Sequence, residues 1–509
     1  MPPAPLRLLI RLATPALLAA CGGGDSSTPI ALPVDPHCDL ATAPSAAFEA
    51  CETANLARTT EAPAELDEVA PGYPNGLMAH DSNTTNFWIL RAIEHPTRFP
   101  LNNEFSPQVV CAKGASVCMG DPKRHPDVDG ADGQHFREEV AEVHRVLYLD
   151  RHCNLLSGHV WQPRNLPLGE RRPGVVIRNA ATWGGEALYW WAAQALVRAG
   201  YVVLTHDPYG EGASEHSRAS LAAPPDFSPE AALIDSIAFL QSSPTQPHPQ
   251  GVSCRYSPAT VDTYNPAHTH LDATRIGVAG HGAGAMEAAS VQSHDAPGAT
   301  PWPGSHTADN PIRAIVAWDG LGSPQQPRVA AALGADAPLP FTPDMQALRP
   351  DWGAWVIVPR VPALGFTAEY GVRPVAFEAD PPRNGHLGGF SAWRAAGIDA
   401  LQITIAGATP YDFALMLDMP ATSWCPTLID NACRGGWARP MIEHYTVAWF
   451  DRWLKAPGTP GHDTAEARLL DDATWAPRMS HHFASARSLR RHDGKMSLCV
   501  DIRLGCQGE

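Results

Sequence analysis

The sequence predicts an α/β fold with a mostly parallel central sheet, and two observations carry this prediction. From about residue 136 onward, short apolar runs alternate with segments whose apolar residues recur at helical spacing. Within this region, the run 174–179 (GVVIRN), the amphipathic segment 187–199 and the run 201–205 (YVVLT) follow one another, and Gly200 ends the segment between the two runs. This order is a βαβ unit, in which the two strands are parallel.

The other elements are predicted in chain order from the same patterns. Residues 140–150 and 156–162 read as two antiparallel strands joined by a turn. A helix is expected over 229–240, and further strands are expected from residue 275 and over 314–318, 361–366 and 400–405. The last long helix, 440–455, carries an aromatic and apolar stripe that is typical of core packing, formed by Ile442, Tyr445, Trp449 and Trp453.

These patterns divide the chain into four parts. Residues 1–20 are a processing segment, and 21–135 are a tether and an irregular segment rich in Pro, Asn, Asp and Gly. Residues 136–475 form the α/β domain, and 476–509 form a C-terminal extension that we expect to be a short flap. No internal repeat and no transmembrane span is apparent after residue 20.

Composition excludes several classes of function. The chain has 509 residues, 44% of them hydrophobic, which is enough for a substantial core. Its 37 basic residues against 53 acidic ones give a formal charge of −16, which argues against nucleic acid as a partner. No C-x-x-C pair occurs and the histidines are scattered, so we expect neither a metal site nor a cofactor.

The N-terminus predicts export. Arg7 and Arg11 lie beside an apolar stretch that ends in small residues, and Leu18-Ala19-Ala20-Cys21 resembles the lipobox of bacterial lipoproteins. The resemblance implies that Cys21 is acylated and anchors the protein in the cell envelope. The glycine after it favours the outer membrane, periplasmic or surface side, if the source is Gram-negative. The alternative is a plain secretory peptide followed by a stray cysteine.

Export predicts disulfides, and ten cysteines remain when Cys21 is set aside. Spacing favours four local pairs and leaves a fifth by elimination. The predicted pairs are Cys38 with Cys51, Cys111 with Cys118, Cys425 with Cys433, Cys499 with Cys506, and Cys153 with Cys254.

One short stretch points to a specific fold. Residues 276–286, IGVAGHGAGAM, have the strand, turn and helix start of the nucleophile elbow G-x-S-x-G, with glycine in place of the serine. Together with the segments 193–214, 361–371, 397–413 and 443–455, this stretch resembles the α/β-hydrolase fold, and most closely its secreted bacterial esterase-like members. The resemblance covers about residues 136–470.

In that family the catalytic residues follow the chain order serine, acid, histidine. The resemblance puts Gly282 at the serine position, Glu369 at the acid position and Pro410 at the histidine position, so two of the three functional groups are absent. The oxyanion donors are backbone groups and do not depend on side chains. The resemblance assigns them to Ala283 and to the loop that begins with Asn179 and Ala180.

The joint loss at Gly282 and Pro410 favours a pseudohydrolase that binds a small acyl or carboxylate ligand, or a protein partner, without turnover. It touches the membrane only through its anchor. The alternative is an active carboxylic ester hydrolase with a displaced nucleophile, such as Thr182, Ser290 or a water molecule, and a histidine from another loop, for which His386 is the nearest candidate. A third alternative is a sequence variant of an active esterase, in which serine and histidine at the two positions together restore cleavage.

Other conspicuous residues have structural interpretations. Asp207 and Asp319 follow strands and are expected to order turns or cap helices. An aromatic group near the oxyanion loop fits pocket lining and core packing equally well, and consists of Trp183, Tyr189, Trp190 and Trp191.

Overall fold

The fold is described from a computed structural model. The described residues are 110–111, 118–119, 140–180, 185–209, 213–215, 229–254, 261–322, 357–369, 383–406, 408, 410–414 and 438–506. The chain divides into the units Met1–Asp35 and Pro36–Glu509, and all of the described residues belong to the second.

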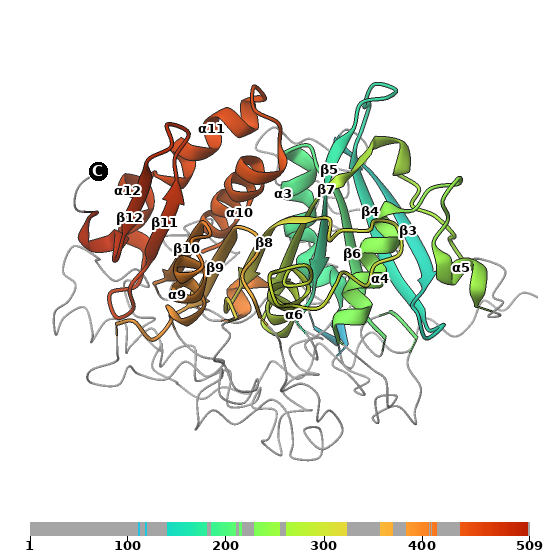
Figure 1. The fold of residues 1–509 in the computed structure, drawn as a ribbon, viewed down its shortest axis with the longest axis horizontal. Helices are drawn as coiled ribbons and strands as arrows, with labels where there is room; N and C mark the ends of the chain where they lie inside the picture. The colour runs from blue at the N-terminus through green and yellow to red at the C-terminus, as the bar shows by residue number, and fades with distance from the viewer. Residues whose placement is uncertain are drawn as a thin grey trace, which may run out of the picture. The chain divides into compact units, whose positions relative to one another are not determined.

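Ten of the described strands form one sheet (Figure 1). Their order across it is β12 (Met496–Cys499), β11 (Ala486–Arg490), β10 (Ala400–Ile405), β9 (Ala363–Ala368), β8 (Ile312–Trp318), β7 (Leu271–His281), β5 (Arg172–Arg178), β6 (Val202–Asp207), β4 (Leu155–Pro163) and β3 (Ala141–Leu149). The six strands from β10 to β6 are parallel to one another. At both ends the sheet continues with antiparallel strands.

Helices cover both faces of this sheet. On one face, α3 (Trp190–Arg198) and α10 (Ala438–Leu454) pack into a large cluster of buried apolar residues. On the other face, a second cluster includes α4 (Pro229–Gln241), α6 (Ala283–Val291) and α9 (Gly388–Ala395). The other helical segments are η5 (Glu186–Tyr189), α5 (Pro249–Ser253), η6 (His268–His270), η8 (Pro410–Phe413), α11 (Pro460–Leu469), α12 (Asp472–Trp475), η9 (Ala476–Arg478) and η10 (Ile502–Leu504).

This architecture confirms the predicted α/β-hydrolase fold, with a mostly parallel sheet between two layers of helices. The strand over 400–405 is found as predicted, and the two N-terminal strands pair antiparallel. The helix predicted over 187–199 begins later, because residues 186–189 form a 3-10 turn before α3. In α10, the side chains of Ile442, Tyr445 and Trp449 are fully buried, which confirms the core interpretation of the stripe.

The structure contains two of the predicted disulfides, Cys153–Cys254 and Cys499–Cys506. Two-residue strands β1 (Val110–Cys111) and β2 (Cys118–Met119) place the backbones of Cys111 and Cys118 opposite each other. The remaining predictions lie outside the described residues, namely the pairs Cys38 with Cys51 and Cys425 with Cys433, the acylated Cys21 and the processing segment 1–20.

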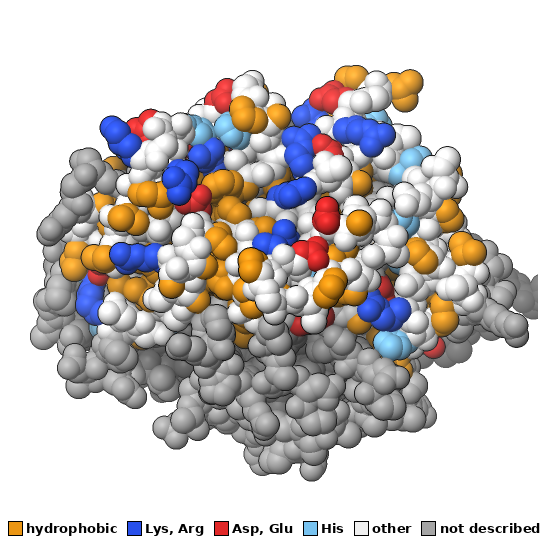
Figure 2. Space-filling view, viewed as in Figure 1, with side chains coloured by type: hydrophobic (Ala, Val, Ile, Leu, Met, Phe, Trp, Pro, Cys, Tyr) orange, Lys and Arg blue, Asp and Glu red, His pale blue; other side chains and the backbone are white. Residues whose placement is uncertain are grey.

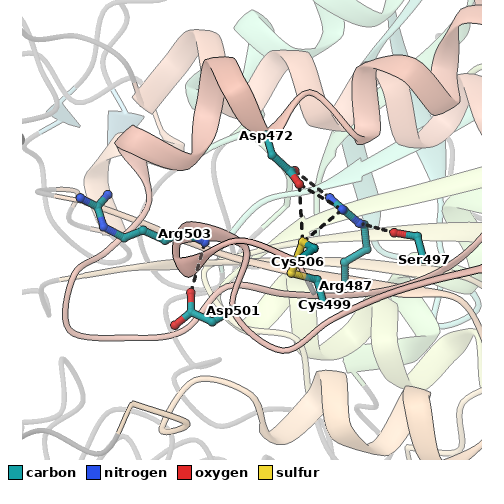
Figure 3. Close-up of a disulfide and its surroundings, with 7 residues drawn as sticks. All are labelled: Asp472, Arg487, Ser497, Cys499, Asp501, Arg503 and Cys506. Atoms are coloured by element: carbon teal, nitrogen blue, oxygen red, sulfur yellow. Dashed lines mark hydrogen bonds and ion pairs between the residues drawn. A yellow bond between two sulfur atoms is a disulfide. The ribbon is translucent and has the colours of Figure 1, made fainter. Parts of the chain in front are cut away.

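The C-terminal extension differs from a simple flap. Its strands β11 and β12 continue the central sheet beyond β10, and a disulfide closes the turn that follows β12 (Figures 1 and 3). Among the described helices, none combines the length and the apolar character that a membrane crossing requires.

Candidate active site

Gly282 lies at the sharp turn between β7 and α6. Its backbone has φ 53° and ψ −114°, a conformation that residues with a side chain rarely adopt. The N–H of Gly282 donates to Trp318 O at 2.9 Å, and its carbonyl accepts from Ala285 N–H at 3.1 Å, which starts the helix. Gly282 therefore lies in a sharp strand-to-helix turn at the carboxyl end of a central parallel strand, which is the geometry that the resemblance predicts for the elbow.

The two flanking glycines are required by packing. A Cβ atom on Gly280 would lie 2.1 Å from Gly284 O, and one on Gly284 would lie 2.4 Å from Asn179 O, both far inside van der Waals contact. Among the described residues, a Cβ on Gly282 would instead meet only Ala180 Cβ, at 3.8 Å. The elbow thus keeps space for a side chain at the one position of the motif where catalysis would need one.

The oxyanion donors differ in their surroundings. Ala283 is the first residue of α6, so its N–H has no acceptor within the helix. The N–H of Ala180 donates to the hydroxyl of Tyr189 at 3.2 Å, and this hydroxyl is also 2.7 Å from Nδ1 of His281. One of the donors assigned from the resemblance is therefore engaged by a tyrosine side chain of the same site.

His281, the residue before Gly282, is held as a neutral imidazole. Burial lowers its pKa to about 3, so it carries no charge near neutral pH. The phenol oxygen of Tyr189 accepts from the N–H of Ala180 and lies 2.7 Å from Nδ1 of His281. A hydroxyl and an imidazole are thus hydrogen-bonded directly beside the elbow.

A buried ion pair joins the oxyanion loop to the elbow helix. Arg178, the last residue of β5, donates to Glu287 of α6 through Nε at 2.6 Å and through Nη2 at 2.9 Å. Both side chains are about 2% exposed, and Nη1 of Arg178 also donates to Asn179 O at 3.0 Å. This pair fixes the start of the loop relative to the first two turns of α6.

Glu369 lies one residue beyond the end of β9 and is buried. The hydroxyl of Ser480 donates to its carboxylate. That serine is itself held, because its N–H donates to Thr404 O at 2.8 Å and its oxygen accepts from His482 N–H at 3.0 Å. The acid position therefore carries a carboxylate that is held by the segment after η9.

Pro410 begins η8, in the loop after β10 where the resemblance puts the catalytic histidine. In the same turn, the ring of Phe413 lies 5.6 Å from the ring of His281, measured between centroids. The loop thus reaches the elbow as it does in a hydrolase, but position 410 has no group that transfers protons.

His386, the candidate for a displaced histidine, lies elsewhere. Its ring stacks on Phe483 at 3.8 Å between centroids, and its Nδ1 is 3.3 Å from the hydroxyl of Thr404. Burial lowers its pKa to about 4. Its contacts within the described part of the chain are with β10 and the C-terminal segment rather than with the elbow.

The two acids that follow strands have different roles. The carboxylate of Asp207 accepts from Glu186 N–H at 2.6 Å and from Ala213 N–H at 2.9 Å, so it orders two loops, as expected.

Asp319 follows Trp318, whose carbonyl accepts from the N–H of Gly282, and it has a positive φ of 58°. Its carboxylate accepts from Ala368 N–H at 3.1 Å, and desolvation raises its pKa to about 6. Asp319 therefore combines a positive φ with a raised pKa, next to the residue whose carbonyl holds the N–H of Gly282.

Of the two candidate hydroxyls for a displaced nucleophile, only Ser290 belongs to the described part of the chain. Thr182 lies outside the described residues, as does Trp183. Ser290 is buried in the second half of α6 and donates to the carboxylate of Glu230.

Tyr189, Trp190 and Trp191 belong to a cluster of buried core residues. Within the described ranges, no group of three or more His, Cys, Asp or Glu side chains could hold a metal ion.

No protein-family model matches the chain, and no curated protein matches it. Among solved structures, an esterase from Pyrobaculum calidifontis is 17% identical with a TM-score of 0.34, over 60% of this chain and 86% of that one. A thermophilic esterase from the planctomycete Thermogutta terrifontis is 13% identical with a TM-score of 0.38, over 62% of this chain and 95% of that one. Because both TM-scores are below 0.5, the fold assignment relies on the strand order and the elbow.

Proposed function

We propose that the protein is a pseudohydrolase, a binding protein built on a hydrolase site. The observation that carries the proposal is that Gly282 has no hydroxyl to attack a carbonyl carbon, although the nearest described atom would lie 3.8 Å from a Cβ placed there. Pro410 removes the general base that would activate such a hydroxyl. Without both groups, a bound ester meets no nucleophile and no proton acceptor in the positions that hydrolysis requires.

The ligand that suits this site carries a carbonyl or carboxylate oxygen. The N–H of Ala283 lies at the N-terminus of α6, where backbone donors and the helix dipole favour negative charge. The ion pair of Arg178 and Glu287 keeps the neighbouring loop in place. We therefore infer a small acyl or carboxylate ligand, with a protein partner as a further occupant of the same face.

We also propose that Cys21 is acylated and that this lipid anchors the protein in the cell envelope. The support is the sequence Leu18-Ala19-Ala20-Cys21 and the glycines that follow it. Mass spectrometry of the N-terminal peptide tests the proposal. We expect a diacylglyceryl-modified cysteine in the wild type and no acyl group on the N-terminal peptide of Cys21→Ser.

The catalytic part is tested with a fluorophosphonate probe and a panel of short acyl esters. We expect no labelling and no turnover above the buffer rate for the wild type. Ester cleavage by the double variant Gly282→Ser, Pro410→His would instead favour the third alternative, a sequence variant of an active esterase. Either single variant should stay inactive. Turnover by the wild type that Glu369→Ala abolishes would overturn the proposal.

One observation favours a second candidate, an ester hydrolase with a displaced apparatus. The hydroxyl of Tyr189 and Nδ1 of His281 form a hydrogen-bonded pair beside the donor N–H of Ala180. Under this candidate the wild type cleaves esters, and Tyr189→Phe abolishes cleavage while it leaves the fold intact. If wild type and Tyr189→Phe are equally inactive, the candidate is excluded.

A further inference from the structure

The exposed large hydrophobic side chains of the described surface gather at its C-terminal end. Four of them lie within nine residues of one another, although the described ranges span most of residues 140–506. They are Met496, Leu498, Val500 and Leu504, with exposed fractions of 40%, 48%, 72% and 73%. Single exposed hydrophobics are ordinary on a soluble protein, but a group of this kind marks an interaction surface.

The side-chain pattern of β12 is the reverse of the usual one. A strand with one buried face normally turns apolar side chains inward and polar ones outward. In β12, Met496 and Leu498 face outward, while Ser497 is fully buried and accepts a hydrogen bond from Nε of Arg487 at 2.8 Å. Core packing therefore does not account for Met496 and Leu498 on the outward face of β12.

The segment is also held rigidly. The buried guanidinium of Arg487 binds the carboxylate of Asp472 in α12 through two hydrogen bonds, of 2.7 and 3.0 Å (Figure 3). The disulfide between Cys499 and Cys506 closes the loop that presents Val500 and Leu504. A rigid surface loses little conformational entropy when it binds.

Basic residues surround the apolar group. Residues 490–504 contain four Lys and Arg against two Asp, a formal charge of +2 in a chain whose total is −16. Lys495, which precedes the apolar row, is 79% exposed, and Arg490 is exposed as well. Figure 2 shows hydrophobic and basic side chains next to each other over the end of the sheet that holds β11 and β12.

We propose that this surface, formed by residues 490–504, docks onto an anionic phospholipid membrane. Exposed apolar side chains within a basic surround suit the boundary between charged headgroups and acyl chains. Strand addition by a second chain is a poorer fit, because β12 has only four residues and offers a short hydrogen-bond ladder. The surface would orient a protein that its N-terminal lipid only tethers.

The test is a flotation assay with the full chain that carries Cys21→Ser, so that no acyl group contributes. The vesicles contain equal parts of phosphatidylglycerol and phosphatidylcholine. We expect binding to these vesicles, weak binding to phosphatidylcholine alone, and loss of binding as salt shortens the Debye length. Changing Val500 and Leu504 together to Asp should weaken binding at least about tenfold. Lys495→Glu should weaken it about fivefold or more.

Matched controls come from exposed hydrophobics far along the chain. Leu168 is 96% exposed and Val252 is 68% exposed, and Leu168→Asp with Val252→Asp should bind vesicles as the parent does. Unchanged thermal unfolding midpoints show that the variants are folded. The proposal is overturned if the parent does not bind anionic vesicles, or if both pairs of variants bind equally. It is also overturned if Val500→Asp with Leu504→Asp abolishes only self-association, since the surface would then join two copies of the chain.

Discussion

Replacing Gly282 with serine tests the strained elbow directly. At φ 53° and ψ −114°, a residue with a Cβ costs about 1–3 kcal/mol relative to glycine. The nearest described atom to the new Cβ is Ala180 Cβ at 3.8 Å, so the described residues add no steric penalty. For a folded unit of roughly 350 residues, an unfolding entropy of about 2.1 cal/mol/K per residue converts this cost into a Tm lower by about 1–4 °C.

The assay is differential scanning calorimetry at fixed scan rate, with urea unfolding as a second measure of the free energy of unfolding. Gly397→Ser is the matched control, because Gly397 also has a positive φ, of 72°, with no atom within 4 Å of the added Cβ, and it lies away from the elbow. Gly280→Ser, whose Cβ would lie 2.1 Å from Gly284 O, should lose far more stability or fail to fold.

Two results would refute the reasoning. If Gly282→Ser were as stable as the wild type, the elbow would not hold its central residue in a strained conformation. If Gly282→Ser alone produced rapid ester cleavage, the missing histidine would be supplied by another group, and Pro410 would no longer indicate a loss of function.

Two further predictions concern buried groups beside the elbow. Glu287→Gln leaves the guanidinium of Arg178 buried without its counter-charge, so it should lower the free energy of unfolding by about 3–5 kcal/mol in urea titrations. The control Lys495→Gln removes an exposed ion pair and should lower it by less than about 1 kcal/mol. Burial lowers the pKa of His281 to about 3 in the folded protein. Between pH 6.5 and 3 the unfolded chain therefore binds a proton at His281 more readily than the folded protein does, and the free energy of unfolding falls as the pH falls through this window. Between pH 7 and 5 the wild type should lose about 2 kcal/mol more than His281→Gln, and equal losses would show that His281 titrates normally.

The sheet and the elbow could be predicted because their signals are local. Apolar runs of strand length and the glycine spacing of 280–284 are properties of a few consecutive residues, and each corresponds to one steric requirement. The same holds for the disulfide between Cys499 and Cys506, whose cysteines are seven residues apart. The assignment of function to Gly282, Glu369 and Pro410 remains a prediction.

The surroundings of the site could not be predicted, because they depend on contacts between distant segments. Tyr189 reaches His281 across 92 positions, and Ser480 reaches Glu369 across 111 positions. No periodicity in the chain indicates such pairs. The raised pKa of Asp319 likewise follows from desolvation by packed neighbours, which a sequence pattern does not record.

The backbone conformation of Gly282 does not depend on a catalytic side chain. Glycine is free to relax, yet Gly282 keeps a conformation that a catalytic serine would have to be forced into. The constraint comes from the neighbours, since Gly280 and Gly284 are in close backbone contact and Trp318 O holds the N–H of Gly282. The packing of β7, β8 and α6 therefore maintains the elbow whether or not a nucleophile is present. Under the proposed function, a site for a carbonyl or carboxylate oxygen persists without hydrolysis, because the N–H of Ala283 belongs to this backbone.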